Sequence, residues 1–255
     1  EPLDANPQGF HWGRIAAEDL NYVKQITAAQ PAVITSDLDA MIAKRHEFLT
    51  AYQNKGYADQ YQAFVEQVKT REAPLGSDKL AKAVARYLFK LMAYKDEYEV
   101  ARLYTDGQFL DKLNNTFTGD YKLTFNMAPP LLARKKDEQG RPKKLTFGPW
   151  MLSVLKLTAK LKGLRGSAFD PFGYSEERKT ERALIGEYRA TVSRILEQLT
   201  AEKLDTAIEI ASVPDQIRGY GPVKETAIGD ARQQTEALLN KFYGKEEAVK
   251  FVEVA

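Results

Sequence analysis

The string IRGYGPVKE, near the C-terminal end of the chain, has the residue types and spacing best suited to binding a ligand. Gly219 and Gly221 let backbone N–H groups approach a ligand closely at the start of a helix, where anions are stabilised. Arg218 and Lys224 add two cations beside these groups. The string therefore predicts an anion site, for example for a phosphate of coenzyme A. A plain turn explains the same residues, because glycine adopts positive φ and proline starts helices.

A second candidate is the string LRGSAFDPFGYSEER, in which Arg165 and Asp170 stand among Phe169, Phe172 and Tyr174. Charged groups framed by aromatic rings are typical of small-molecule pockets and of docking surfaces. Its aromatic content predicts an ordered loop that is anchored by these rings. The alternative is structural: Asp170 precedes a proline and starts a turn, Arg165 bonds the carbonyls of a helix end, and the rings fill the core.

A third candidate is a cluster of basic residues at the tip of a predicted β-hairpin. Such a cluster can contact an acidic partner in a salt-dependent way. It can equally be a solvated tip whose charges discourage pairing of the sheet edge. The cluster consists of Arg134, Lys135, Lys136, Arg141, Lys143 and Lys144.

Composition excludes several classes of function. The chain has 255 residues, no cysteine and two histidines, which excludes thiolate nucleophiles, Cys-ligated zinc and iron–sulfur clusters held by this chain. Neither His11 nor His46 has a catalytic or metal-ligating neighbour at useful spacing, and no acid–base pair of carboxylates stands out. The net charge of +2 does not indicate nucleic acid. No apolar run is long enough to span a membrane, so we expect a cytoplasmic protein.

Helical periodicity dominates the first half of the sequence. Residues 1–10 predict an extended linker, and several amphipathic helices follow, one of which should end at Gly56. Ser77 and Asp78 predict the start of the clearest helix, and residues 77–117 predict a helical pair that breaks near a Gly. This half of the chain therefore predicts an all-α arrangement.

The period changes near residue 121. YKLTFNMA and KKLTFG alternate like strands and predict a β-hairpin near 121–148. A helix should follow Pro149, another should start after Ser175, and a last one should run from about 222 to 243. We therefore predict a mostly α fold, a bundle-like single domain over 11–243 with about eight helices and one inserted hairpin, followed by a tail over 244–255.

Six irregular strings carry a resemblance to a known family. In chain order they are HWGR, LMAYKDEYEVARLY, GDYKLTFNMAPPLLARK, FGPWML, LKGLRGSAFDPFGYSEER and IRGYGPVKE. Together they resemble the C-terminal region of the bacterial indolepyruvate ferredoxin oxidoreductases, the region that follows the gamma-type domain. The resemblance extends from about residue 10 to about residue 243, so it covers most of the chain.

The resemblance implies a part of an enzyme that converts aryl-2-oxo acids to aryl-acetyl-CoA and passes electrons to ferredoxin. Such enzymes use thiamine diphosphate and iron–sulfur clusters, which this chain without cysteine is not expected to hold. The implied role is that of a non-catalytic accessory domain packed on other domains or subunits, with ferredoxin as a further partner. Residues 1–10 would then be a linker from the gamma-type domain. The alternatives are a freestanding helical module that binds CoA or another anion, and an unrelated protein-interaction domain.

Overall fold

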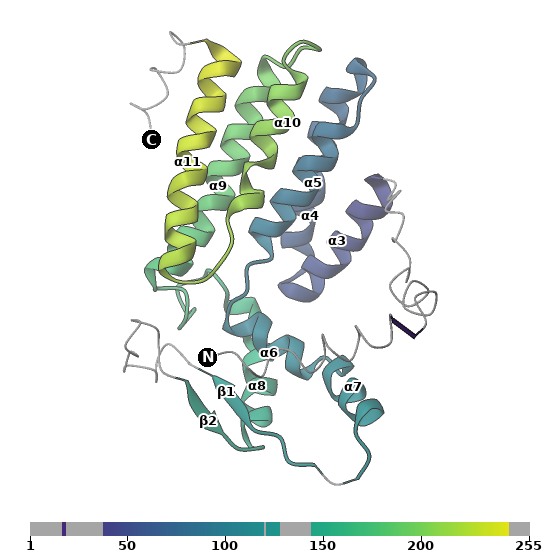
Figure 1. Ribbon diagram of the computed structural model, residues 1–255, viewed down its shortest axis with the longest axis vertical. Coiled ribbons are helices and arrows are strands. Elements are labelled where there is room, and N and C mark those ends of the chain that lie inside the picture. Colours follow the sequence, from purple (N-terminus) through teal and green to yellow (C-terminus); the bar gives the residue numbers. More distant parts are fainter. Residues whose placement is uncertain (1–16, 19–37, 120, 128–143, 245–255) are drawn as a thin grey trace. The chain divides into compact units, whose positions relative to one another are not determined.

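The structure is a computed structural model that describes residues 17–18, 38–119, 121–127 and 144–244. The chain divides into two units, residues 1–40 and 41–255. Nearly all of the described residues belong to the second unit, which holds every candidate site considered below (Figure 1).

Five helices form a unit that we call the bundle (Figure 1). Helix α5 is central, because it packs against α4, α9 and α10. Helix α10 also packs against α11. The amphipathic pattern of α5 explains its place, since Leu80, Val84 and Leu88 recur at helical spacing and are fully buried. The bounds are α4 Lys55–Glu72, α5 Lys79–Met92, α9 Glu176–Glu197, α10 Leu204–Ser212 and α11 Pro222–Tyr243.

The end of α4 stabilises two other helices of the bundle. The buried carboxylate of Glu72 accepts hydrogen bonds from the backbone N–H groups of Leu80 and Ala81, at 2.9 and 2.8 Å, and so caps the N-terminus of α5. The next residue back, Arg71, donates from Nε to the carbonyl of Leu196 at 2.9 Å, near the C-terminus of α9. Both contacts place a charge of the favourable sign at a helix end.

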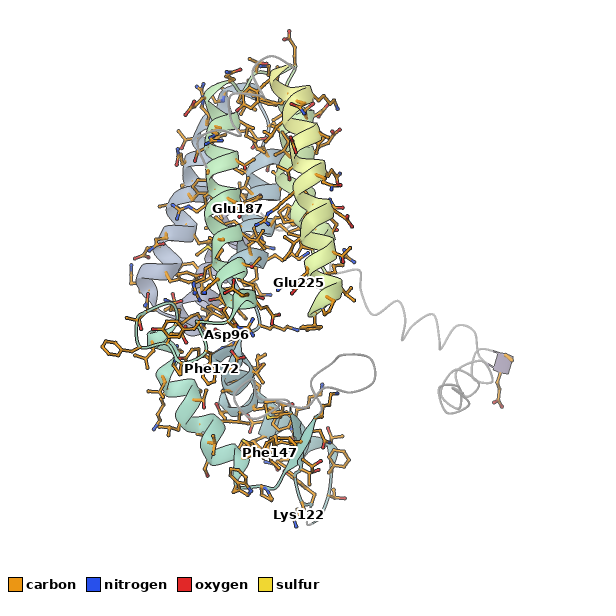
Figure 2. All side chains as sticks on the ribbon, turned by 90° about the vertical axis from the view of Figure 1, so that its left-hand side faces the viewer. Asp96, Lys122, Phe147, Phe172, Glu187 and Glu225 are labelled. Carbon is orange, nitrogen blue, oxygen red and sulfur yellow. The ribbon has the colours of Figure 1, made fainter. Side chains whose placement is uncertain are left out.

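A smaller region, which we call the lobe, contains three helices and the hairpin, whose second strand carries Phe147 (Figure 2). Its centre is the contact between α6 and α8, which lie far apart in the sequence. The strands pair antiparallel, with Phe125 opposite Phe147 and Met127 opposite Leu145. Its buried core is small, comprising Ala101, Phe125, Met151 and Leu155. The bounds are α6 Glu97–Thr105, α7 Gln108–Thr116, β1 Phe125–Met127, β2 Leu145–Phe147 and α8 Met151–Lys160.

The structure confirms a mostly α fold with one two-stranded antiparallel hairpin. The described residues contain nine α-helices, with α3 at Leu38–Tyr52 as the first, whereas about eight were expected. The predicted helix end at Gly56 is wrong, because Asn54 caps α4 through its side chain and Gly56 lies in the first turn of that helix. In the described part of the chain, no helix has the length and apolar character needed to cross a membrane.

Candidate functional site

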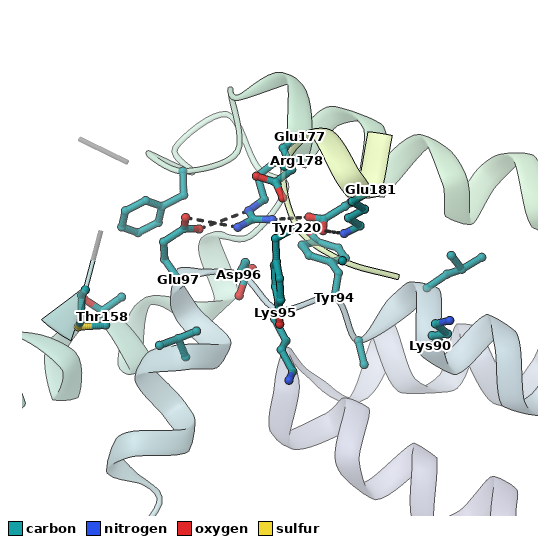
Figure 3. A pocket seen from close by; sticks show the side chains of 18 of the residues that line it. Lys90, Tyr94, Lys95, Asp96, Glu97, Thr158, Glu177, Arg178, Glu181 and Tyr220 are labelled. Carbon is teal, nitrogen blue, oxygen red and sulfur yellow. Dashed lines mark hydrogen bonds and ion pairs between the residues drawn. The ribbon is translucent and has the colours of Figure 1, made fainter. Parts of the chain in front are cut away.

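A pocket of about 1200 Å³ lies where the lower end of the bundle faces the lobe (Figure 3). One wall comes from α5 and from the segment that joins it to α6. The other walls come from α6, β1 and α8, from the start of α9, and from the start of α11 with the loop before it. Segments far apart in the sequence therefore meet at one cavity, for instance Lys90 and Lys224, which are 134 residues apart.

One wall of the pocket is a chain of alternating charges that joins α6, α9 and α11 (Figure 3). Arg178 lies 3.4 Å from the carboxylate of Glu97 and 2.5 Å from that of Glu181. Glu181 also accepts a hydrogen bond from Lys224. Burial lowers the pKa of Arg178 but its two carboxylate neighbours raise it, and the net effect is an increase. Two cations and two anions leave this wall without net charge.

The anion-site candidate lies at this pocket. Arg218, Gly219, Gly221 and Lys224 all line it, together with the exposed Tyr220. Both glycines have positive φ, 96° at Gly219 and 55° at Gly221, so the turn interpretation explains why glycine is needed here. A Cβ on Gly219 would also come within 2.8 Å of Val223.

The two cations of this candidate are already paired within the protein. Arg218 is largely exposed and contacts the Asp215 carboxylate at 2.9 Å, while Lys224 pairs with the buried Glu181. A ligand at this end of the pocket would therefore compete with existing ion pairs.

Arg165 lies beneath the pocket and is held on all sides by the protein. It donates to the carboxylate of Asp96 at 2.5 and 2.9 Å and to the carbonyl of Tyr52, the last residue of α3, at 2.7 Å. Its guanidinium carbon also lies 3.6 Å from the centroid of the Tyr52 ring. The side chains of Arg165 and Asp96 are 2% and 3% exposed. Bonding to a helix-end carbonyl was the structural alternative for this arginine, and the buried ion pair was not foreseen.

Asp170 is likewise satisfied internally. It accepts hydrogen bonds from the hydroxyl of Tyr98 at 3.1 Å and from the backbone N–H groups of Gly166 and Phe172 at 2.8 and 3.1 Å. The bond to Phe172 is the local turn expected of an aspartate before a proline. Asp170 thus folds the loop 165–175 upon itself and ties that loop to α6.

The expectation that three aromatic rings anchor this loop is wrong for two of them. Phe172 packs on Tyr98 with ring centroids 5.2 Å apart, whereas Phe169 is 81% and Tyr174 62% exposed. Backbone and carboxylate hydrogen bonds order the loop, and the hydroxyl of Tyr174 adds a bond to the carbonyl of Ala168 at 2.5 Å, so neither ring has to be buried.

The residues that line the rest of the pocket were not predicted to form a site. Lys95 is exposed and makes no hydrogen bond or ion pair with the described residues, and burial raises the pKa of Tyr94 to about 12, with Asp96 as a further cause. The lobe side of the pocket is apolar and includes Val100, Tyr104, Met127, Met151 and Leu155.

The remaining candidates do not form a site among the described residues. Of the basic cluster, Lys144 is described and exposed, whereas the other five residues lie outside the described ranges, as does His11. His46 Nε2 lies 2.8 Å from a carboxylate oxygen of Asp59, whose pKa is lowered by hydrogen bonds from Lys55 and from this histidine. In the described ranges, no group of three or more His, Asp or Glu side chains is placed to hold a metal ion.

A second surface feature is a stripe of exposed apolar side chains along α8, which we call the α8 face. Trp150 is 59%, Val154 44%, Leu157 62% and Leu161 43% exposed. Their spacing of four, three and four residues places them on one side of the helix. The adjacent side of α8 is buried in the lobe core through Met151 and Leu155, and Val154, at the edge between the two sides, also lines the pocket. The helix is thus apolar on two sides, and only one of them is covered within the described structure.

Comparisons with known proteins gave one match. Residues 38–237 match a family of unknown function, DUF6537. No curated protein and no solved structure matches the chain. The matched range covers the helices from α3 into α11, and with them the hairpin, the pocket and the α8 face. On this match, which spans well over half of its length, the chain belongs to the DUF6537 family of unknown function.

Proposed function

We propose that the chain is a non-catalytic accessory domain of a cytoplasmic indolepyruvate-type ferredoxin oxidoreductase, and that it packs through the α8 face against other domains or subunits of that enzyme. The six strings that resemble the C-terminal region of such enzymes support the enzyme class. The whole enzyme would oxidatively decarboxylate aryl-2-oxo acids to aryl-acetyl-CoA and reduce ferredoxin. Thiamine diphosphate and the iron–sulfur clusters would be held elsewhere, since this chain has no cysteine to ligate a cluster.

The single observation that carries the packing role is the exposure of the α8 face. A monomeric protein rarely leaves a row of large apolar side chains on one side of a helix, and such rows mark interaction surfaces. Trp150 and Leu157 are the most exposed members, at 59% and 62%. Covering them would remove apolar area from water, a gross gain of about 25 cal/mol for each Å² buried that offsets the entropy cost of association.

The test is association of this chain with the remainder of the oxidoreductase, the two expressed as separate polypeptides. We expect the wild-type chain to co-purify and the double variant Leu157→Ser/Leu161→Ser, which leaves the pocket lining unchanged, to lose most of the association. The matched control is Phe169→Ser/Val223→Ser, which removes exposed apolar side chains from outside the α8 face and should leave association unchanged. Thermal unfolding of each variant checks that it is folded.

Two outcomes would contradict the proposal. One is a wild-type chain that does not associate with the remainder of the enzyme. The other is an association that the α8 variant and the control weaken equally.

The pocket favours a second candidate, a module that binds a small molecule such as CoA or another anion. It brings the 217–224 segment into a cavity large enough for such a ligand. A ligand at 100 times its Kd adds about 2.7 kcal/mol of stability, so CoA, inorganic phosphate and aryl-2-oxo acids can be screened by thermal shift. We expect Arg218→Gln to reduce a genuine shift, whereas Arg232→Gln, which alters a comparably exposed arginine of α11, should not. No shift with any of these compounds would exclude them as ligands.

A further inference from the structure

The segment of the sequence that carries the α8 face is basic. Between Glu138 and Asp170 the sequence contains no acidic residue. Lys156 and Lys160 are exposed on α8, and neither makes a hydrogen bond or ion pair with any residue that the structure describes. Two cations without a partner among the described residues, beside an apolar stripe that those residues leave exposed, favour a partner that brings negative charge along with apolar side chains.

The geometry of the stripe specifies the form of this partner. Residues 150, 154, 157 and 161 follow the four-three-four spacing with which helices pack side by side in coiled coils. In that register Lys160 lies directly beside the seam that these four residues form. Coiled coils place charged residues at this position, where they select the partner helix. Lys156 lies one turn before Lys160 on the same flank. The other flank of the stripe turns into the lobe, where Met151 and Leu155 are buried.

The length of the stripe gives the expected strength of the contact. Trp150 and Leu161 are eleven positions apart in the sequence, which corresponds to about 17 Å of helix. A seam of this length contacts about three turns of a partner helix and falls in the range of small, weak interfaces. It would become strong when both helices belong to one assembly, because tethering raises the effective concentration.

We propose that the α8 face binds an amphipathic helix whose apolar seam covers Trp150, Val154, Leu157 and Leu161 and whose flanking acidic residues pair with Lys156 and Lys160. This inference deepens the proposed function, since it names the chemistry of the partner at that same face. A second copy of this chain fits less well, because its α8 face would bring further lysines to the contact.

The test uses the complete chain and synthetic peptides, so it does not depend on the identity of the oxidoreductase. Trp150 is one of two tryptophans in the sequence and reports directly on the face once Trp12 is replaced by Phe. Two helical peptides share the same leucine seam, and one carries flanking glutamates where the other carries lysines. We expect the acidic peptide to shift the Trp150 emission to the blue and to bind at least about tenfold more tightly than the basic one at low salt.

Variants separate the two parts of the proposal. Lys156→Glu/Lys160→Glu should reverse the preference between the peptides, whereas Lys79→Glu/Lys241→Glu, the same charge change at two exposed lysines of the bundle, should not. Leu157→Ser/Leu161→Ser should abolish binding of both peptides.

Three results would overturn this inference. One is equal binding of the acidic and basic peptides, and another is no emission shift with either peptide. The third is a shift with phosphatidylserine vesicles that neither peptide produces, which would identify an anionic lipid surface as the occupant instead. The co-purification test above does not depend on these results. An apolar contact without charge selectivity would therefore contradict the acidic partner but not the accessory role.

Discussion

The bundle and the lobe bury their apolar residues to different extents. In the bundle, α5 is surrounded by α4, α9 and α10, and its core positions are fully buried. The lobe has four core residues, and between 103 and 161 it exposes eight of the twelve large apolar side chains that are exposed among the described residues. The bundle therefore accounts for its own stability, whereas the lobe keeps much of its apolar surface available for contacts outside the described structure. The eight are Leu103, Phe117, Tyr121, Leu145, Trp150, Val154, Leu157 and Leu161.

The largest effect should come from breaking the buried ion pair beneath the junction of the two regions. Arg165→Met would leave the Asp96 carboxylate buried without its cation and should lower the free energy of unfolding by about 3–5 kcal/mol, measured in urea. The exposed pair of Arg232 and Glu187 provides the control, and Arg232→Met should cost about 0–1 kcal/mol.

Replacing both partners sharpens this result. Asp96→Leu/Arg165→Met removes both charges and should be less destabilising than Arg165→Met alone. Equal losses for the Arg165 and Arg232 variants would show that the junction does not depend on this pair.

A pair of core truncations compares the two regions directly. Leu88→Ala in the bundle core should cost about 2–5 kcal/mol, because α5 is enclosed by three helices and the cavity cannot collapse. Leu155→Ala should lie near the low end of this range, since Leu155 also borders the pocket. Hydrogen exchange should show that the lobe opens at lower free energy than the bundle in both variants. A larger loss for the Leu155 variant would contradict the comparison.

The carboxylate cap of α5 should have a smaller effect. Glu72→Gln keeps the shape of the side chain but removes the charge that accepts two backbone hydrogen bonds, so we expect a loss of about 1–3 kcal/mol. Glu66→Gln on the same helix changes an exposed carboxylate and serves as the control. If both variants retained wild-type stability, the cap would be unimportant for the bundle.

The smallest effect near neutral pH concerns the buried tyrosines. Burial raises the pKa values of Tyr52, Tyr57 and Tyr188, so these hydroxyls stay protonated in the folded protein at pH values where an unfolded tyrosine ionises. Stability should therefore be constant below about pH 10 and fall above it, as ionisation favours the unfolded chain. The Tm from pH 7 to 11.5 and the absorbance of tyrosinate measure this. Full ionisation near pH 10 without loss of Tm would show that the hydroxyls are accessible.

Local signals in the sequence predicted the elements where a cap or a proline decides the boundary. Ser175 accepts a hydrogen bond from the Arg178 N–H at the start of α9, and the last helix has the bounds expected from Pro222. The helix end predicted at Gly56 is wrong because the side chain of Asn54, two residues earlier, caps the start of a new helix there. A glycine alone does not say whether a helix ends before it or begins around it.

Local sequence patterns do not predict which residues from distant parts of the chain lie in contact. Asp96 and Arg165 are 69 residues apart, and nothing in either local string indicates that they meet. The pocket has the same property, because its walls come together only once the chain is folded. The exposure of Trp150 and Leu157 could not be predicted either, since the sequence does not distinguish an exposed apolar residue from a buried one.

Arg71 and Glu72 act on opposite ends of two different helices. Since one side chain closes the N-terminus of α5 and its neighbour the C-terminus of α9, neither helix can complete its hydrogen bonding until the last turn of α4 is in place. Formation of the three helices is thereby linked. Because of this link the bundle should unfold as a set rather than helix by helix, whereas a chain truncated within α4 should lose the cooperativity of the whole transition.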